Sequence, residues 1–203
     1  MQYGFHFNQN RCTGCFICVV ACRDWYDVPA GPASRLRIQT TEKGKFPDVF
    51  VARLPITCFH CVQPTCVPAC PVEAISKREE DGIVVVDREA CLGKDSCSLC
   101  LDACPHDAPQ FGDEDNAKMQ KCDFCEERLA EGQKPICVDS CPVRALAAGP
   151  IDELREEYGD VRDAEGFVHS EDLGPSIVFK PKRDARGLVV HGVDIRPSTE
   201  TSG

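Results

Sequence analysis

Four cysteines close together near the N-terminus constrain this chain more than any other feature. Two residues separate each of the first three, and the fourth follows after three more, in the order Cys12, Cys15, Cys18 and Cys22. This spacing is typical of a loop that binds a [4Fe–4S] cluster through its first three thiolates, because one tight loop can reach three iron corners of a cubane. The fourth thiol lies too far along the chain to reach the same cluster and is expected to serve a neighbouring one. The spacing therefore predicts further runs of this kind.

Three such runs follow, so the same half-unit is repeated four times in the chain. Every run ends in Cys-x-x-x-Cys, and in the last three runs a proline follows the final cysteine. The gaps differ: the second run has four residues before its third thiol, the third has five in its first gap, and the fourth has eleven in its second gap. The cysteines of these runs are Cys58, Cys61, Cys66 and Cys70; Cys91, Cys97, Cys100 and Cys104; and Cys122, Cys125, Cys137 and Cys141.

Three uses of the 16 cysteines compete at this point. A disulfide scaffold is disfavoured because bridges at Cys-x-x-Cys spacing are strained. Structural zinc usually takes two Cys-x-x-Cys knuckles for each ion, and it does not require three thiols in one loop plus a fourth before a proline. Four iron–sulfur clusters use all the thiols without remainder and are the favoured interpretation.

Composition narrows the class of protein further. Aromatic residues make up only 7% of the 203 residues, so the apolar core is thin and metal clusters are expected to help hold the fold. The net charge of −10 argues against a nucleic-acid partner. Residues 1–7 lack a basic segment followed by an apolar one, and no stretch approaches the roughly 20 apolar residues that span a bilayer. We therefore expect a soluble chain without a direct membrane span, which reaches a membrane only with a partner.

The residue pattern between the cysteine runs predicts short elements of an α+β fold. A cysteine-free C-terminal segment, with a polar end, is expected to pack over the cluster body or to reach a partner. The predicted elements are strands at 3–7, 83–87 and 177–180, a strand–turn–strand segment at 35–54 with its turn at 42–45, a charged turn at 76–82, and helices at 16–26, 126–131 and 151–158.

The chain resembles the four-cluster iron–sulfur subunit of the dimethyl sulfoxide reductase family of molybdenum and tungsten oxidoreductases. The resemblance extends beyond the cysteines over most of the chain. The segments that carry it are Gln2–Phe5, Arg11–Cys15, Cys70–Pro71, Gly82–Asp87, Ala108–Gln110, Lys121–Asp123, Lys134–Cys137 and Gly149–Leu154.

The resemblance implies that the runs exchange their last cysteines. The implied ligand sets are Cys12, Cys15, Cys18 and Cys141 for the first cluster; Cys122, Cys125, Cys137 and Cys22 for the second; Cys58, Cys61, Cys66 and Cys104 for the third; and Cys91, Cys97, Cys100 and Cys70 for the fourth. It also implies two ferredoxin-like domains, the second inserted in the first. The outer domain would comprise residues 1–54 and 106–150 and the inner domain residues 55–105, with a C-terminal extension at 151–203.

The five-residue gap between Cys91 and Cys97 departs from the family pattern, in which two residues are usual. Loops tolerate insertion, so both sulfurs can still reach one cube. Some relatives replace one ligand in this run, but all four thiols are present here. We therefore predict four [4Fe–4S] clusters and no three-iron cluster.

The function implied is single-electron relay, with no catalytic residue in this chain. The partners would be a large molybdopterin catalytic subunit and a membrane-anchor or other redox subunit, and the complex is expected at the periplasmic side of the membrane after export on a partner's signal. A cytoplasmic relay for a formate dehydrogenase, hydrogenase or aromatic reductase is one alternative, and a redox-inert, metal-stapled binding module is another. Basic residues near the runs either tune the potentials or are simply solvated, with the second use favoured for each: Arg11, Lys77, Arg78, Lys94, Lys118 and Lys121. His60, His106, Trp25 and Tyr26 are expected to pack rather than to ligate or carry electrons.

Overall fold

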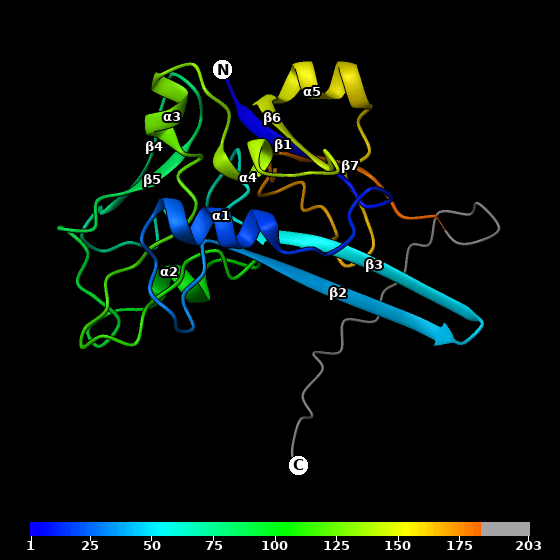
Figure 1. Cartoon of the computed structure of the whole chain (residues 1–203). Coiled ribbons are helices and arrows are strands. Elements are labelled where there is room, and N and C mark those ends of the chain that lie inside the picture. Colours follow the sequence, from blue (N-terminus) through cyan, green and yellow to red (C-terminus); the bar gives the residue numbers. More distant parts are fainter. Residues whose placement is uncertain (184–203) are drawn as a thin grey trace, which may run out of the picture.

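A computed structural model describes residues 1–183, in which short strands and helices are joined by long cysteine-bearing loops (Figure 1). The strands described are β1 (Tyr3–Asn8), β2 (Leu36–Lys45), β3 (Asp48–Thr57), β4 (Ile75–Lys77), β5 (Val84–Val86), β6 (Leu146–Pro150) and β7 (Ile177–Lys180). The helices described are α1 (Ile17–Trp25), α2 (Leu99–Asp102), α3 (Glu126–Ala130), α4 (Ile136–Asp139) and α5 (Ile151–Tyr158). The fold is thus the mixture of helix and strand that the sequence predicts.

A three-stranded sheet of order β6-β1-β7 joins the two ends of the described chain. β1 pairs antiparallel with β6, with Phe5 opposite Ala148, and parallel with β7, with Phe5 opposite Ile177. Because β1 leads into the first cysteine run and β6 follows the fourth, this sheet brings those two runs together. The buried residues Phe5 and Phe7 on β1 pack into the core beneath them.

The second and third runs are joined in the same manner. β4 follows the last cysteine of the second run and pairs antiparallel with β5, which precedes the third run, with Ile75 opposite Val86. The sequence predicts a strand at 83–87, which β5 confirms, but it misses β4 and assigns most of that strand to a turn. β4 is only three residues long, which is too short for an alternating pattern to stand out.

Buried apolar side chains form two main cores. The first contains Phe5, Phe59, Phe124 and Phe179 and reaches the cysteines of the first and fourth runs. The second contains apolar residues of the inner runs together with four residues that follow them: Ala108, Phe111, Ala117 and Met119. The apolar packing therefore divides the thiols into an outer and an inner group.

The β2–β3 hairpin forms an arm that extends away from the rest of the molecule (Figure 1). The predicted strand–turn–strand segment is confirmed, but the predicted turn at 42–45 is wrong, because Glu42 and Lys43 pair with Val51 and Phe50 in the ladder. The chain reverses instead between Lys45 and Asp48, where the Phe46–Pro47 peptide bond is cis. Proline lacks the N–H that a strand ladder needs and therefore sits in the turn.

The predicted helices and the predicted C-terminal strand are confirmed. The predicted helix at 16–26 is α1 and the one at 126–131 is α3. α5 buries Ile151 and Leu154 against Val178 of β7, and Gly159 follows the helix at a φ of 90°. β7 confirms the strand at 177–180 and packs this part of the tail on the cluster body. The polar end of the tail, residues 184–203, lies outside the described residues.

Candidate metal-cluster sites

The loops that present the first thiols share one backbone feature. In each run, the residue two positions after the first cysteine has a positive φ: 71° at Gly14, 45° at His60, 88° at Gly93 and 64° at Phe124. A left-handed residue is uncommon outside glycine and turns the chain sharply. The third run keeps this turn although its first gap is longer, so the four loops begin alike.

The segments after the last cysteines are also repeated. The residue three positions after Cys70, Cys104 or Cys141 is left-handed, with φ values of 52°, 48° and 49° at Glu73, Asp107 and Arg144. The next residue is then able to turn its N–H back to the sulfur. Ala74 donates to Sγ of Cys70 and Ala145 to Sγ of Cys141, each at 3.3 Å. Burial raises the pKa of the Cys104 thiol, and a backbone hydrogen bond from Ala108 opposes this rise.

Three cavities each have four thiols in their walls. Each combines three cysteines of one run with the last cysteine of another run. The thiol groups are Cys22, Cys122, Cys125 and Cys137; Cys58, Cys61, Cys66 and Cys104; and Cys70, Cys91, Cys97 and Cys100.

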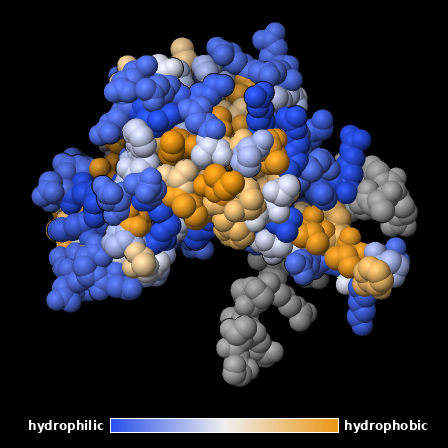
Figure 2. Space-filling view, viewed as in Figure 1, coloured by the Kyte–Doolittle hydropathy of each residue, from blue (hydrophilic) through white to orange (hydrophobic). Residues whose placement is uncertain are grey.

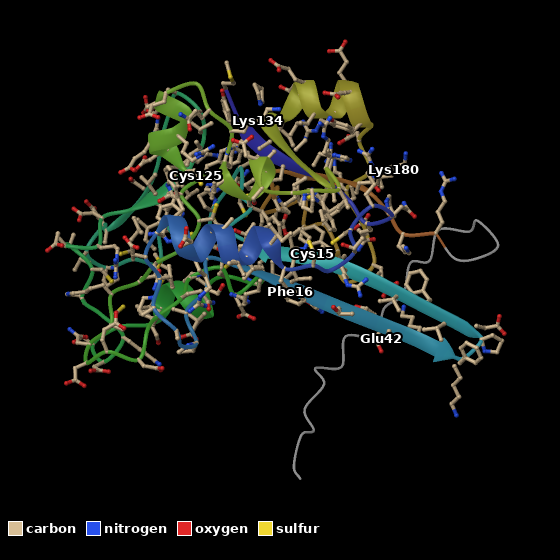
Figure 3. All side chains as sticks on the ribbon, in the orientation of Figure 1. Cys15, Phe16, Glu42, Cys125, Lys134 and Lys180 are labelled. Atoms are coloured by element: carbon tan, nitrogen blue, oxygen red, sulfur yellow. The ribbon has the colours of Figure 1, made fainter. Side chains whose placement is uncertain are left out.

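The remaining thiols form a fourth group that lies closer to the surface. Burial raises the pKa of Cys18 to about 11, and the neighbouring thiols of Cys141, Cys12 and Cys15 raise it further. Cys15 is the one exposed cysteine among the 16, all of which lie within the described residues (Figure 3). These four groups are the sets that the resemblance implies, and their role as cluster ligands stays a prediction.

The donor set and its surroundings fit iron–sulfur clusters. All 16 thiols are free of disulfides. Burial raises the pKa of Cys22 and of Cys61 to about 12, so these thiols would stay protonated without a cation. A bound metal removes that proton outright and supplies the missing positive charge. Across residues 1–183, no three His, Cys, Asp or Glu side chains converge closely enough to hold a single metal ion.

Three of the six basic residues singled out in the sequence donate to carbonyls of the ligand loops. Lys77 Nζ donates to the Cys61 carbonyl at 3.1 Å, Lys118 Nζ to that of Cys91 at 2.5 Å, and Lys121 Nζ to that of Cys122 at 3.0 Å. Lys121 is buried and also donates to the Val84 carbonyl. By contrast, Arg78 makes ion pairs with acidic residues near the surface.

The histidines and aromatic residues singled out in the sequence pack in the core or on it. His60 is fully buried, and its Nδ1 accepts a hydrogen bond of 3.0 Å from the Val84 N–H. Burial lowers the pKa of His60 well below its usual value. His106 stacks on Phe167 with ring centroids 5.2 Å apart. The guanidinium of Arg128 lies 4.9 Å from the ring centroid of Trp25. These residues are therefore not additional ligands in this arrangement.

Sequence reasoning missed a polar cluster at the second group of thiols. Tyr26, predicted only to pack, donates a hydrogen bond to Asp123, which also pairs with Arg35. Asp123 is flagged in the sequence by its place between Cys122 and Cys125. Arg35 lies 88 positions away from Asp123, so no local pattern indicates that it belongs to the site.

An exposed apolar surface adjoins Cys15. Phe16, Ile17, Val20 and Trp25 of the α1 region are all exposed. Figure 2 shows apolar side chains gathered over the centre of this face, where α1 lies in Figure 1. No helix within the described residues combines the length and the apolar character needed to cross a membrane.

Comparison with known proteins bears on the family. The family model of a 4Fe-4S dicluster domain matches residues 49–151. The iron–sulfur subunit of the anaerobic dimethyl sulfoxide reductase of Escherichia coli (strain K12) is 44% identical over 193 residues, which cover 91% of each protein. This chain belongs to the family of dimethyl sulfoxide reductase iron–sulfur subunits. The corresponding subunit from Haemophilus influenzae is 41% identical over 194 residues, covering 91% of this chain and 92% of the relative.

A more distant relative extends the family to another reaction. The iron–sulfur subunit of the sulfite dehydrogenase of Allochromatium vinosum is 32% identical over 208 residues, covering 91% of this chain and 85% of the relative. As a member of this family, the protein is an iron–sulfur electron-transfer subunit of an oxidoreductase complex and not its catalytic subunit. The predicted function class is confirmed at this level.

Proposed function

We propose that the chain relays single electrons through four [4Fe–4S] clusters, each held by one of the four thiol groups. Three of the groups line cavities, and each group joins three thiols of one run to the last thiol of another. This exchange of last cysteines is the observation that carries the proposal, because a run of this spacing is built to serve two clusters. Each cluster would accept and release one electron at a time.

The residues around the thiols would hold and tune these clusters. Apolar side chains such as Phe5, Phe59 and Ile136 exclude water from the second thiol group. Backbone N–H groups, such as those of Ala74 and Ala145, donate to ligand sulfurs. Hydrogen bonds to sulfur and burial are two means by which a protein sets a cluster potential. The chain needs no acid–base residue for this function.

We further propose that the outer and inner runs form two ferredoxin-like domains, the second inserted in the first. The β1–β6 pairing supports an outer domain built from the first and fourth runs, and the β4–β5 pairing supports an inner one. Phe111 and Met119 pack with the inner core, so the inner domain would draw part of its core from the segment that follows residue 105.

The electron partners proposed are a molybdopterin catalytic subunit and a membrane or soluble redox subunit. The relatives' names support this, since they place one relative in a dimethyl sulfoxide reductase and another in a sulfite dehydrogenase. The complex would be associated with the membrane through its partner subunits, on the periplasmic side. Dimethyl sulfoxide reduction is favoured over sulfite oxidation because identity is higher to the first of these relatives.

Redox titration followed by electron paramagnetic resonance tests the proposal. Anaerobically purified protein is expected to show four one-electron centres, each of the [4Fe–4S] type. The Cys125→Ser variant is expected to alter one centre and to leave the other three in place. Centres that cannot be reduced would support a redox-inert module and would overturn the relay. Isolation of the native complex, followed by identification of the other subunits, tests the proposed partner.

A further inference from the structure

One polar cluster stands at the wall of an otherwise apolar cavity. The cavity is the one lined by the second thiol group, Cys22, Cys122, Cys125 and Cys137. Its other walls are mostly aliphatic and aromatic, including Leu36, Ile136 and Ile177. Apart from the thiols, Tyr26 and Thr57 are the polar side chains among the described lining residues. Charges next to such a cavity act strongly, because little water screens them.

Tyr26 leads from this wall to a pair of opposite charges. Its hydroxyl donates to Oδ1 of Asp123, and Nη1 of Arg35 donates to Oδ2 of the same carboxylate at 2.7 Å. The Arg35 guanidinium carbon lies 3.7 Å from the centroid of the Tyr26 ring. The side chains of Arg35 and Asp123 are only 11% and 21% exposed. Each of the three residues thus contacts the other two.

The backbone connects this cluster directly to the ligand loops. Asp123 lies between two thiols of the group, and its Oδ1 accepts a hydrogen bond of 3.0 Å from the Cys125 N–H. Tyr26 follows α1, the helix that carries Cys22. Arg35 is held from behind, because the Thr57 hydroxyl donates to its carbonyl at 2.9 Å. Burial is the main cause that raises the pKa of the Cys22 thiol, while Arg35 lowers it and Asp123 raises it.

We propose that Arg35 and Asp123 form a positioned charge pair that sets the reduction potential of the cluster at Cys22, Cys122, Cys125 and Cys137, with Tyr26 holding the carboxylate in place. This inference rests on the proposed function. Reduction adds one electron, and so one negative charge, to the cluster, and no bond forms or breaks. The Arg35 cation favours the added charge and the Asp123 carboxylate opposes it. The two residues therefore act on the potential with opposite signs.

The test is a redox titration, followed by electron paramagnetic resonance, of the complex with its partner subunits. The variants are Arg35→Gln, Asp123→Asn, the double variant and Arg35→Lys. Lys43→Gln and Glu165→Gln are the matched controls, because this partly buried ion pair of 2.8 Å lines none of the thiol cavities. Iron content is measured on each sample, and the Cys125→Ser variant identifies which centre belongs to this group.

Opposite shifts of one centre are the expected result. Arg35→Gln lowers its potential, Asp123→Asn raises it, the double variant and Arg35→Lys lie near the wild type, and the controls move no centre. Shifts of equal sign, no shift, or loss of this cluster's iron in Arg35→Gln and Asp123→Asn alike would overturn the inference and leave the pair a structural role. A wild-type complex with fewer than four reducible centres would instead contradict the proposed function.

Discussion

The N–H of Ala145 points back to Sγ of Cys141, four residues earlier in the chain, at a donor–acceptor distance of 3.3 Å. Ala74 and Cys70 repeat this relationship at the same distance. In both places the residue before the alanine is left-handed, with φ values of 49° at Arg144 and 52° at Glu73. The Cys-Pro segments are thus small structural units in which one unusual backbone conformation supplies a hydrogen bond to a candidate ligand.

The backbone at Arg144 is expected to matter more than its charge. Arg144→Gly and Arg144→Val both remove the guanidinium, but only valine is strained at a φ of 49°. We expect Arg144→Val to be less stable than Arg144→Gly by about 1–2 kcal/mol, measured from guanidinium unfolding midpoints. Since its Ala145 N–H is displaced, Arg144→Val should also lower the potential of the cluster at Cys141. Equal midpoints for the two variants would show that the left-handed turn carries no such weight.

Lys121 is expected to contribute to both stability and potential. Its Nζ donates to the carbonyls of Val84 and Cys122, and its side chain lines the cavity of Cys58, Cys61, Cys66 and Cys104. Lys121→Met leaves both carbonyls without this donor, which should cost about 2 kcal/mol. Loss of the cation should lower the potential of that cluster. Denaturation and redox titration measure the two effects, with Lys43→Met as the control; unmoved potentials would remove Lys121 from the tuning residues.

The long first gap of the third run is held by Asn116. Its Nδ2 donates to the Leu92 carbonyl at 2.9 Å, and a Cβ on Gly93 would come within 2.2 Å of Asn116 Oδ1 and 2.5 Å of its carbonyl oxygen. Gly93 also has a φ of 88°. We expect Gly93→Ala to destabilise this loop by roughly 1–2 kcal/mol or more and to speed iron loss from the cluster at Cys97. The decay of absorbance in air measures this loss. A decay rate like that of the wild type would contradict the prediction.

His6 is expected to make stability depend on pH. It is buried and stacks on Tyr158 with ring centroids 3.8 Å apart, and its Nε2 has no partner among the described residues. Burial lowers its pKa to about 4, with a smaller lowering by Lys180 and an opposing rise from Glu157. The neutral form is thus the folded form, and the unfolded chain takes up a proton below about pH 6.5. Stability present above that pH is lost toward pH 4, by up to about 3 kcal/mol.

His6→Phe provides the comparison for this pH effect, since phenylalanine can stack on Tyr158 and does not titrate. The difference in unfolding midpoint between wild type and variant should be small at about pH 8 and should move in favour of the variant between about pH 6.5 and pH 4. A difference that stays constant over this range would assign the acid sensitivity to other groups.

The sequence predicted what local spacing controls and missed what depends on distant contacts. The cysteine runs, α1, α5 and β7 follow from periodicity and from turn residues close in the chain. The hairpin turn was placed at Glu42–Lys45 because a glycine and charged residues mark it there, whereas Pro47 decides it. The pairing of β1 with β6 and the contact of Arg35 with Asp123 join segments far apart in sequence, so no local pattern reveals them.

Iron and inorganic sulfide content, together with native mass spectrometry of the anaerobically purified protein, tests the four-cluster assignment most directly. We expect sixteen iron atoms and sixteen sulfides for the 16 cysteines, and a mass that corresponds to four cubanes with every thiol reduced. A sample with intact protein but bound zinc, far less iron, or cysteines bridged to one another would contradict the assignment.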